Sequence, residues 1–334
     1  RFLSADAVQK ANSGHPGMPM GMADVATVLL SRFMNFSASN PDWPDRDRLI
    51  LSAGHGSMLL YSLLHLTGYK DFTIDEIKNF RQLGSRTAGH PEFGHGAGIE
   101  TTTGPLGQGL ANASGMALAE RMLSERFGSE IVDHYTYVIA GDGCLMEGVS
   151  HEAASFAGHL RLGKLVVVFD DNGISIDGST QLAVNDNQLM RFEACGWHVS
   201  ECDGHDPDAI EQVIKQARET QDKPSFIACK TTIGFGSPNK AGTAATHGAP
   251  LGEDEIAATR ESLKWPHPAF EIPQAVTSAW RRIGAMHTEK VEAWKKRLNE
   301  SGQKDEFERV MSGTLPKKWE NPLQEFKRKH TEEK

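Results

Sequence analysis

The sequence lacks the features that mark several classes of protein. No apolar run in its 334 residues approaches transmembrane length, and no secretory signal heads the chain, so we expect no membrane association. An excess of positive charge is also missing, because 35 lysines and arginines stand against 44 acidic residues. The formal net charge of −9 argues against nonspecific binding to nucleic acid or to an anionic membrane.

Cysteine is scarce as well. The four cysteines, at positions 144, 195, 202 and 229, show no Cys-x-x-Cys spacing. Scattered thiols fit a reducing cytoplasm better than a disulfide framework, so we expect a cytoplasmic protein. A disulfide between Cys195 and Cys202 is the less favoured alternative. Hydrophobic residues make up 39% of the chain, enough for a sizeable core in one or two domains.

The most informative stretch runs from residue 135 to residue 172. Residues 135–140 predict a buried strand, residues 144–160 a helix, and residues 165–169 a second strand. A strand–helix–strand unit places its two strands in parallel. Asp142 and Asn172 therefore follow the carboxyl ends of neighbouring strands, where open α/β sheets bind ligands. A carboxylate and an amide oxygen suit Mg²⁺, although aspartate between glycines is also a common turn residue.

Similar patterns recur along the chain. They predict an α/β fold, a mostly parallel sheet flanked by helices on both faces, over residues 1–264. Residues 265–334 predict a helical linker, with a long charged helix at 273–299 and an exposed tail after Leu315. The other expected strands are 48–52, 197–201 and 224–231, and the other expected helices are 1–9, 22–33, 57–66, 107–126, 186–194, 206–220 and 304–311.

Two glycine-rich loops, residues 84–109 and 234–251, interrupt these elements. Long irregular segments in compact domains are usually functional, and glycine lets backbone approach a ligand closely. The helix that begins after Gly107 offers free N–H groups to an anion. The segment 107–112 fails the dinucleotide fingerprint at its last position, which disfavours a nicotinamide enzyme.

Four histidines lie in or beside glycine or proline breaks: His15, His55, His90 and His247. Loops at strand ends can bring such residues together above one sheet edge, where histidine can pass protons and bind sugar hydroxyls. The alternative is that each is an ordinary core or surface residue. We expect that ordinary role for the histidines inside or beside elements, His65, His134, His151, His159 and His198.

The Gly-Asp-Gly turn at 141–143, followed by Asn172, resembles the thiamine diphosphate motif. The longer blocks 13–17, 141–148, 171–178 and 234–240, in this order, resemble the transketolase family specifically. One departure is Ala244-Ala245-Thr246 before His247, where transketolases often have His-Asp-Ser.

The resemblance implies a site for thiamine diphosphate and Mg²⁺, with Ca²⁺ as a possible substitute. The implied metal ligands are Asp142, Asn172 and the backbone carbonyl of Ile174. The implied cofactor-binding residues are His55, Gly104, Pro105, Leu106, Gly143, Asn172 and His247. The implied catalytic residues, facing the sugar, are His15, His90 and His247.

The resemblance also implies the reaction. A transketolase of the pentose phosphate pathway transfers a two-carbon ketol unit from a ketose phosphate to an aldose phosphate through the C2 carbanion of the cofactor. Members are homodimers, and acids matching Glu147 and Glu152 link their two cofactor sites. The chain resembles only the amino-terminal module, so we expect the pyrimidine-binding module and its glutamate elsewhere, in a longer chain or, less favoured, in a partner subunit.

Three alternatives stay open. Two are other thiamine enzymes, dihydroxyacetone synthase and 1-deoxyxylulose-5-phosphate synthase. The third is a noncatalytic fragment that binds only the cofactor or a partner half.

Overall fold

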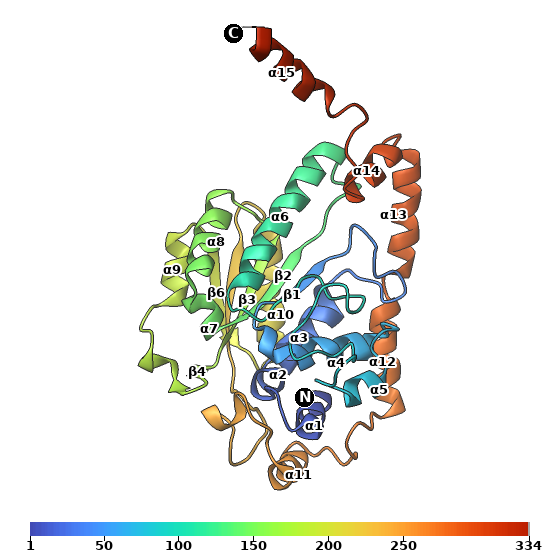
Figure 1. Ribbon diagram of the computed structural model, residues 1–334. Helices are drawn as coiled ribbons and strands as arrows, with labels where there is room; N and C mark the ends of the chain where they lie inside the picture. Colours follow the sequence, from blue (N-terminus) through green and yellow to red (C-terminus); the bar gives the residue numbers. More distant parts are fainter. Residues whose placement is uncertain (333–334) are drawn as a thin grey trace.

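A five-stranded parallel sheet forms the centre of the computed structural model, which describes residues 1–332 (Figure 1). The order across the sheet is β1-β2-β3-β7-β6, which confirms the predicted α/β fold. Its strands are β1 (Arg48–Leu51), β2 (Thr136–Gly141), β3 (Leu165–Asp171), β6 (His198–Asp203) and β7 (Ser225–Lys230). Two further strands, β4 (Ile174–Ser175) and β5 (Gly178–Ser179), form a small antiparallel hairpin beside β3.

Helices cover both faces of the sheet. The chain steps in one direction from β1 through β2 and β3 to β6, and then returns to β7. Because parallel crossovers are right-handed, the return places α10 (Pro207–Glu219) on the face opposite α6 (Gln108–Phe127), α8 (Gly148–His159) and α9 (Gln188–Ala194). The inner strand β3 is consequently buried on both faces, and Val166, Val167 and Val168 have no exposed surface.

The remaining helices of the amino-terminal part pack beside this sheet, and a π-helical turn (Leu29–Phe33) continues α3 (Figure 1). Their bounds are α1 (Phe2–Ala11), α2 (Gly17–Gly21), α3 (Ala23–Val28), α4 (Ser57–Thr67) and α5 (Ile74–Lys78). The predicted start of α10 is confirmed, since the Asp206 carboxylate accepts hydrogen bonds from the N–H groups of Asp208 and Ala209. Residues 253–262, which no sequence pattern predicted to be helical, form α11 (Glu253–Ser262).

Two predicted helices are each divided in the structure. The helix expected at 144–160 is α7 (Asp142–Met146) followed by α8, because Glu147 between them is extended. The helix expected at 273–299 is α12 (Gln274–Ala285) and α13 (Thr288–Glu300). The exposed tail after Leu315 contains α15 (Asn321–Glu332), which projects from the body in Figure 1.

The carboxy-terminal helices before this tail are packed against the sheet-containing part. Helix α12 contacts α4 so closely that a Cβ added to Gly284 would lie 1.8 Å from the carbonyl oxygen of Thr67. Helix α13 buries Trp294, whose Nε1 donates to the carbonyl oxygen of Ile131 at 2.7 Å. Phe307 of α14 (Lys304–Met311) is buried in the same cluster. The hydrophobic packing therefore continues past residue 264. The domain boundary expected at that residue stays a prediction.

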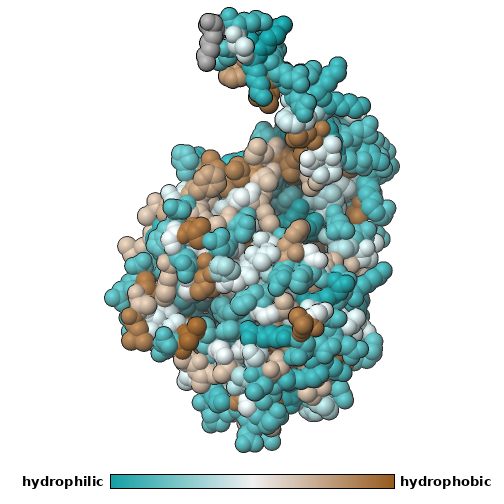
Figure 2. Space-filling view, in the orientation of Figure 1, coloured by the Kyte–Doolittle hydropathy of each residue, from teal (hydrophilic) through white to brown (hydrophobic). Residues whose placement is uncertain are grey.

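The face of the molecule shown in Figure 2 is mostly hydrophilic. Apolar side chains gather toward the side where α8, α9 and the loop after β3 lie. Exposed members of this apolar surface are Phe156, Ile176, Leu182 and Met190. Among the helices of residues 1–332, none has the length and apolar content that crossing a bilayer would require.

Candidate functional site

A cavity of about 450 Å³ lies at the carboxyl ends of the strands. Each of four parallel strands leads directly into it: His55 follows β1, Asp142 follows β2, Asn172 follows β3 and Ile233 follows β7. The structure thus brings the two sequence-predicted oxygen donors into one cavity. Its lining consists of His15, Met18, His55, His90, Gly104, Leu106, Gly141, Asp142, Gly143, Cys144, Asn172, Ile174, Ser175, Ile176, Asp177, Ile233 and His247.

The Asp142 carboxylate is the most unusual polar group here. Its Oδ2 atom is buried and accepts no hydrogen bond from the described residues. Burial, helped by the carboxylates of Asp170 and Asp171 and opposed by the Gly173 backbone N–H, raises the pKa of Asp142 to about 7. A buried, unpartnered carboxylate oxygen is costly unless a cation or a proton satisfies it. The geometry therefore fits a ligand to a divalent ion.

The Asn172 side chain is held in one orientation. Its Nδ2 donates to Asp170 Oδ2 at 2.8 Å, and its Oδ1 accepts from the Ile174 N–H at 2.9 Å. Asp170 is 1% exposed and also accepts a hydrogen bond from the Thr231 hydroxyl. These contacts fix which end of the amide carries the oxygen, whose second lone pair stays available to a cation.

The donors available here suit a hard cation that brings other ligands with it. No three His, Cys, Asp or Glu side chains within residues 1–332 gather as a metal site. The expected set has a single carboxylate, Asp142, with an amide oxygen and a backbone carbonyl. Mg²⁺ is typically held by one or two protein carboxylates, with substrate phosphate oxygens completing its shell.

The four singled-out histidines all line this cavity, as the loop positions predicted. The ring centroids of His15 and His55 lie 5.0 Å apart, those of His55 and His247 5.2 Å, and those of His15 and His247 5.7 Å. His90 is exposed at the cavity edge. The Nδ1 atoms of His15 and His247 are buried and unpartnered among the described residues.

Burial keeps these imidazoles neutral. Together with the neighbouring histidines, it lowers the pKa of His15 to about 4 and that of His55 to about 3. Burial also lowers the pKa of His247, and partial desolvation together with the nearby Arg81 charge lowers that of the more exposed His90. A neutral imidazole offers one donor and one acceptor, so the cluster can bind hydroxyl groups and relay protons at neutral pH.

The first glycine-rich loop is fastened at its histidine. Ser57 Oγ donates to the Gly89 carbonyl at 3.0 Å, and the Tyr61 hydroxyl donates to the His90 carbonyl at 3.1 Å. The loop continues to Leu106, and a Cβ added at Gly143 would lie 2.9 Å from the Leu106 Cδ1, so a larger residue at position 143 would require this side chain to move. Pro105 is exposed and outside the cavity lining, so its expected cofactor contact stays a prediction.

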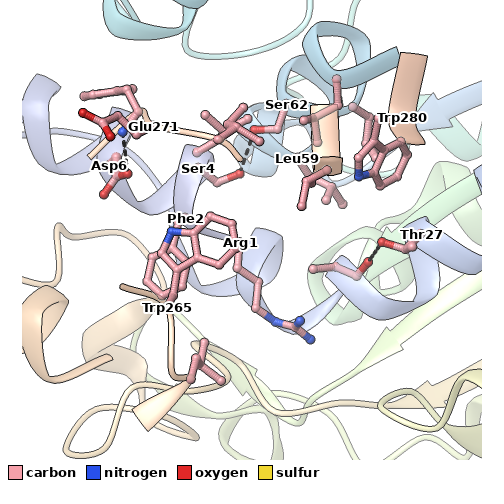
Figure 3. Close-up of a pocket in the computed structure, with 18 residues that line it drawn as sticks. Arg1, Phe2, Ser4, Asp6, Thr27, Leu59, Ser62, Trp265, Glu271 and Trp280 are labelled. Carbon is pink, nitrogen blue, oxygen red and sulfur yellow. Dashed lines mark hydrogen bonds between the residues drawn. The ribbon is translucent and has the colours of Figure 1, made fainter. Parts of the chain in front are cut away.

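A second cavity, of about 350 Å³, lies between α1, α4 and the segment 263–280 (Figure 3). Phe2 and Trp265 stack in it with ring centroids 5.8 Å apart, and Leu59 and Trp280 lie across from them. Its lining is mainly apolar and shares no residue with the cavity at the strand ends. The predicted site residues all lie outside it.

Comparison with known proteins decides the family. The sequence model of the family described as "Transketolase, thiamine diphosphate binding domain" matches residues 1–316. The chain belongs to the transketolase family. This confirms the resemblance carried by residues 141–148 and 171–178.

Transketolases from distant organisms are similar to it. The chain is 57% identical to the transketolase of Sinorhizobium medicae over 99% of its own length and 47% of that protein, and 57% identical to transketolase 2 of Escherichia coli over 98% and 50%. A solved transketolase from Leishmania mexicana superposes with a TM-score of 0.93 at 46% identity, over 96% of this chain and 49% of that one. The chain thus spans about half the length of the transketolases it matches.

Some cavity residues were not singled out by the sequence. Ile176, Asp177 and Ser175 belong to the transketolase-like block 171–178, but the sequence pattern predicts no individual role for them. Met18 and Ile233 carry no polar group, so a search for chemistry passes over them. Their signal is position alone, since Met18 follows the His15 turn and Ile233 follows β7.

The lowered pKa of His15 makes a prediction about stability. Between pH 6.5 and 4 the unfolded chain protonates this imidazole while the folded protein keeps it neutral, so falling pH costs wild-type stability. His15→Gln removes that loss, and we expect its free energy of unfolding to rise relative to wild type by on the order of 1 kcal/mol as pH falls from 7 to 4.5. Thermal unfolding at several pH values measures this.

Some groups, such as Asp142, change stability with pH in the opposite direction. Their contribution is the same in both proteins and cancels in the comparison with wild type. The exposed His159, changed to glutamine, serves as the matched control and should show no such trend. A His15→Gln stability difference that stays constant with pH would contradict a neutral, buried His15.

Proposed function

We propose that the chain is the diphosphate- and metal-binding half of a transketolase, which transfers a two-carbon ketol unit between a ketose phosphate and an aldose phosphate. The observation that carries this proposal is the unpartnered Asp142 Oδ2 beside Asn172 in one cavity at the strand ends. Membership of the family supplies the cofactor class that such a pair would hold.

In this proposal Asp142, Asn172 and the Ile174 carbonyl bind Mg²⁺, or Ca²⁺ as a substitute. The Gly143 N–H, which lies in the first turn of α7, would donate to a phosphate oxygen of the cofactor. The cofactor-facing residues are His55, Gly104, Pro105, Leu106, Gly143, Asn172 and His247. When bound, thiamine diphosphate supplies the carbanion and the electron-accepting thiazolium that cleavage of the ketose requires.

The histidines would bind and orient the sugar. Neutral His15 and His247 each have a buried Nδ1 without a partner, which supports a hydrogen-bonding role toward a ligand. His90, exposed at the edge, is free to contact the outer part of a sugar phosphate. These three would hold hydroxyl groups and move protons between them.

The partners we propose are sugar phosphates, a pyrimidine-binding module and a second copy of the chain. The apolar surface over α8, α9 and the loop after β3 (Figure 2) supports burial against another protein surface. We propose a cytoplasmic location, which the four free cysteines support. Nucleic acid and membranes remain outside the proposal, as the net charge of −9 suggests.

Acceptor specificity tests the function against its nearest rivals. The chain is combined with the carboxy-terminal half of the Sinorhizobium medicae relative, and product formation is measured for three substrate pairs. We expect turnover of xylulose 5-phosphate with ribose 5-phosphate. A preference for formaldehyde as acceptor would instead assign dihydroxyacetone synthase. Condensation of pyruvate with glyceraldehyde 3-phosphate would assign 1-deoxyxylulose-5-phosphate synthase.

A further inference from the structure

Two cysteines on neighbouring strands face each other next to the proposed metal site. Cys202 of β6 and Cys229 of β7 are in register, and their Sγ atoms lie 3.7 Å apart. We propose that Cys202 and Cys229 are an oxidation site that forms a reversible disulfide, and that this disulfide weakens cofactor binding in the adjoining cavity. The second half of this inference rests on the proposed function.

The geometry allows the bond. Register neighbours on adjacent strands lie about 4.8 Å apart, within the Cα separation that disulfides span. The two sulfurs must close from 3.7 Å to about 2.05 Å. β6 is the last strand in the sheet order, and within residues 1–332 no strand pairs with its outer edge. β6, held on one side only, can shift toward β7 without breaking a second ladder, and the new bond pulls Cys229 toward β6 in turn.

The two thiols also differ as a reactive pair should. Cys202 is half-buried and reachable from solvent, whereas Cys229 is 1% exposed. Their contact lowers the pKa of Cys202 and raises that of Cys229. Cys202 is therefore the attacking thiolate and Cys229 the resolving thiol.

Hydrogen peroxide is a sufficient oxidant. The Cys202 thiolate attacks one peroxide oxygen, the O–O bond breaks, and the departing hydroxide takes a proton and leaves as water. The resulting sulfenic acid is attacked by the Cys229 sulfur, which forms the S–S bond and releases a second water. In total the two thiols lose two electrons and two protons, and one peroxide becomes two waters.

The disulfide would affect the proposed metal site because the two cysteines are in register with a residue that supports this site. Asp170, Cys229 and Cys202 are register neighbours on β3, β7 and β6, so their side chains share one face. Asp170 accepts hydrogen bonds from the Asn172 amide and from Thr231, two residues after Cys229. Drawing Cys229 toward β6 displaces Thr231 from Asp170 and loosens the support of Asn172. Loss of such support typically costs metal sites about tenfold or more in affinity.

Peroxide treatment followed by peptide mapping tests the thiol pair. We expect a cross-linked peptide containing Cys202 and Cys229 in wild type and in the control Cys195→Ser, reversed by dithiothreitol, and none in Cys202→Ser or Cys202→Ala. Four thiols that remain free after peroxide, or a different cross-linked pair, would overturn the assignment.

Binding of thiamine diphosphate with Mg²⁺ is then titrated on the same samples, each combined with the relative's carboxy-terminal half. Oxidation should weaken binding about tenfold in wild type and in Cys195→Ser, and leave Cys202→Ser unchanged. Equal affinities for the cross-linked and reduced proteins would refute the coupling. If the reduced protein binds no cofactor, the proposed function fails, while the peptide map still decides the oxidation site.

Discussion

Replacing Asp142 with alanine should abolish Mg²⁺-dependent binding of thiamine diphosphate. Asp142 is the only carboxylate of the expected ligand set, and its Oδ2 has no partner among the described residues that would compensate. We expect the affinity to fall by more than roughly 100-fold, the upper end for loss of a supporting partner of a metal ligand. Titration of cofactor with and without Mg²⁺, followed by protein fluorescence, measures the effect.

Asp142→Asn sharpens this test, because it keeps the shape of the side chain and removes only its charge. The matched control is Asp177→Asn, since Asp177 is an exposed carboxylate that lines the same cavity. The control should change affinity by less than about threefold, as expected for a screened surface charge. Equal losses in the two asparagine variants would mean that overall charge, and not a ligand at the strand tip, governs binding.

The chain alone should have no transketolase activity, and adding the missing half should restore it. By the family resemblance, the glutamate that protonates the aminopyrimidine belongs to a second module. A positioned proton-transfer group contributes about 10²–10⁴-fold to rate, so we expect at least roughly a 1,000-fold gain on recombination. Transfer from xylulose 5-phosphate to ribose 5-phosphate, measured for each half and for the mixture, tests this.

The control for recombination is the mixture made with Asp142→Ala, which should remain inactive although both halves are present. Substantial turnover by the chain alone would show that it needs no second module, and would contradict the division of labour proposed here. If the two halves associate but the mixture shows no turnover, the result would favour the alternative that the chain is a noncatalytic cofactor-binding fragment.

The sequence was sufficient to predict which side chains meet in the cavity at the strand ends, because the fold places strand ends together. The apolar runs at 135–140 and 165–169 predicted two parallel strands, and the structure pairs them as β2 and β3 with Gly141 opposite Asp170. Asp142 and Asn172 then share a cavity by topology alone. The histidines needed the same inference, since His15 and His247 are 232 positions apart yet only 5.7 Å from centroid to centroid.

Other features depend on tertiary packing that local patterns do not encode. The charged residues 273–311 indicated a linker, but Trp294 and Phe307 are buried against Phe127 and Ile131. The break at Glu147 divides α7 from α8 in a stretch without proline. The sequence offered Cys195 only as a less favoured partner of Cys202, whereas the register of β6 on β7 brings Cys229 to it. The residues of β6 and β7 do not by themselves specify the strand order that sets this register.

The central claim is that Asp142 and Asn172 hold one divalent ion that binds the cofactor's diphosphate. A crystal structure of the recombined protein with thiamine diphosphate and Mn²⁺, which marks its own position by anomalous scattering, tests this most directly. We expect one anomalous peak about 2.0–2.2 Å from Asp142 and Asn172 oxygens and from two diphosphate oxygens. A metal peak elsewhere, or diphosphate bound with these two side chains uncoordinated, would contradict the account.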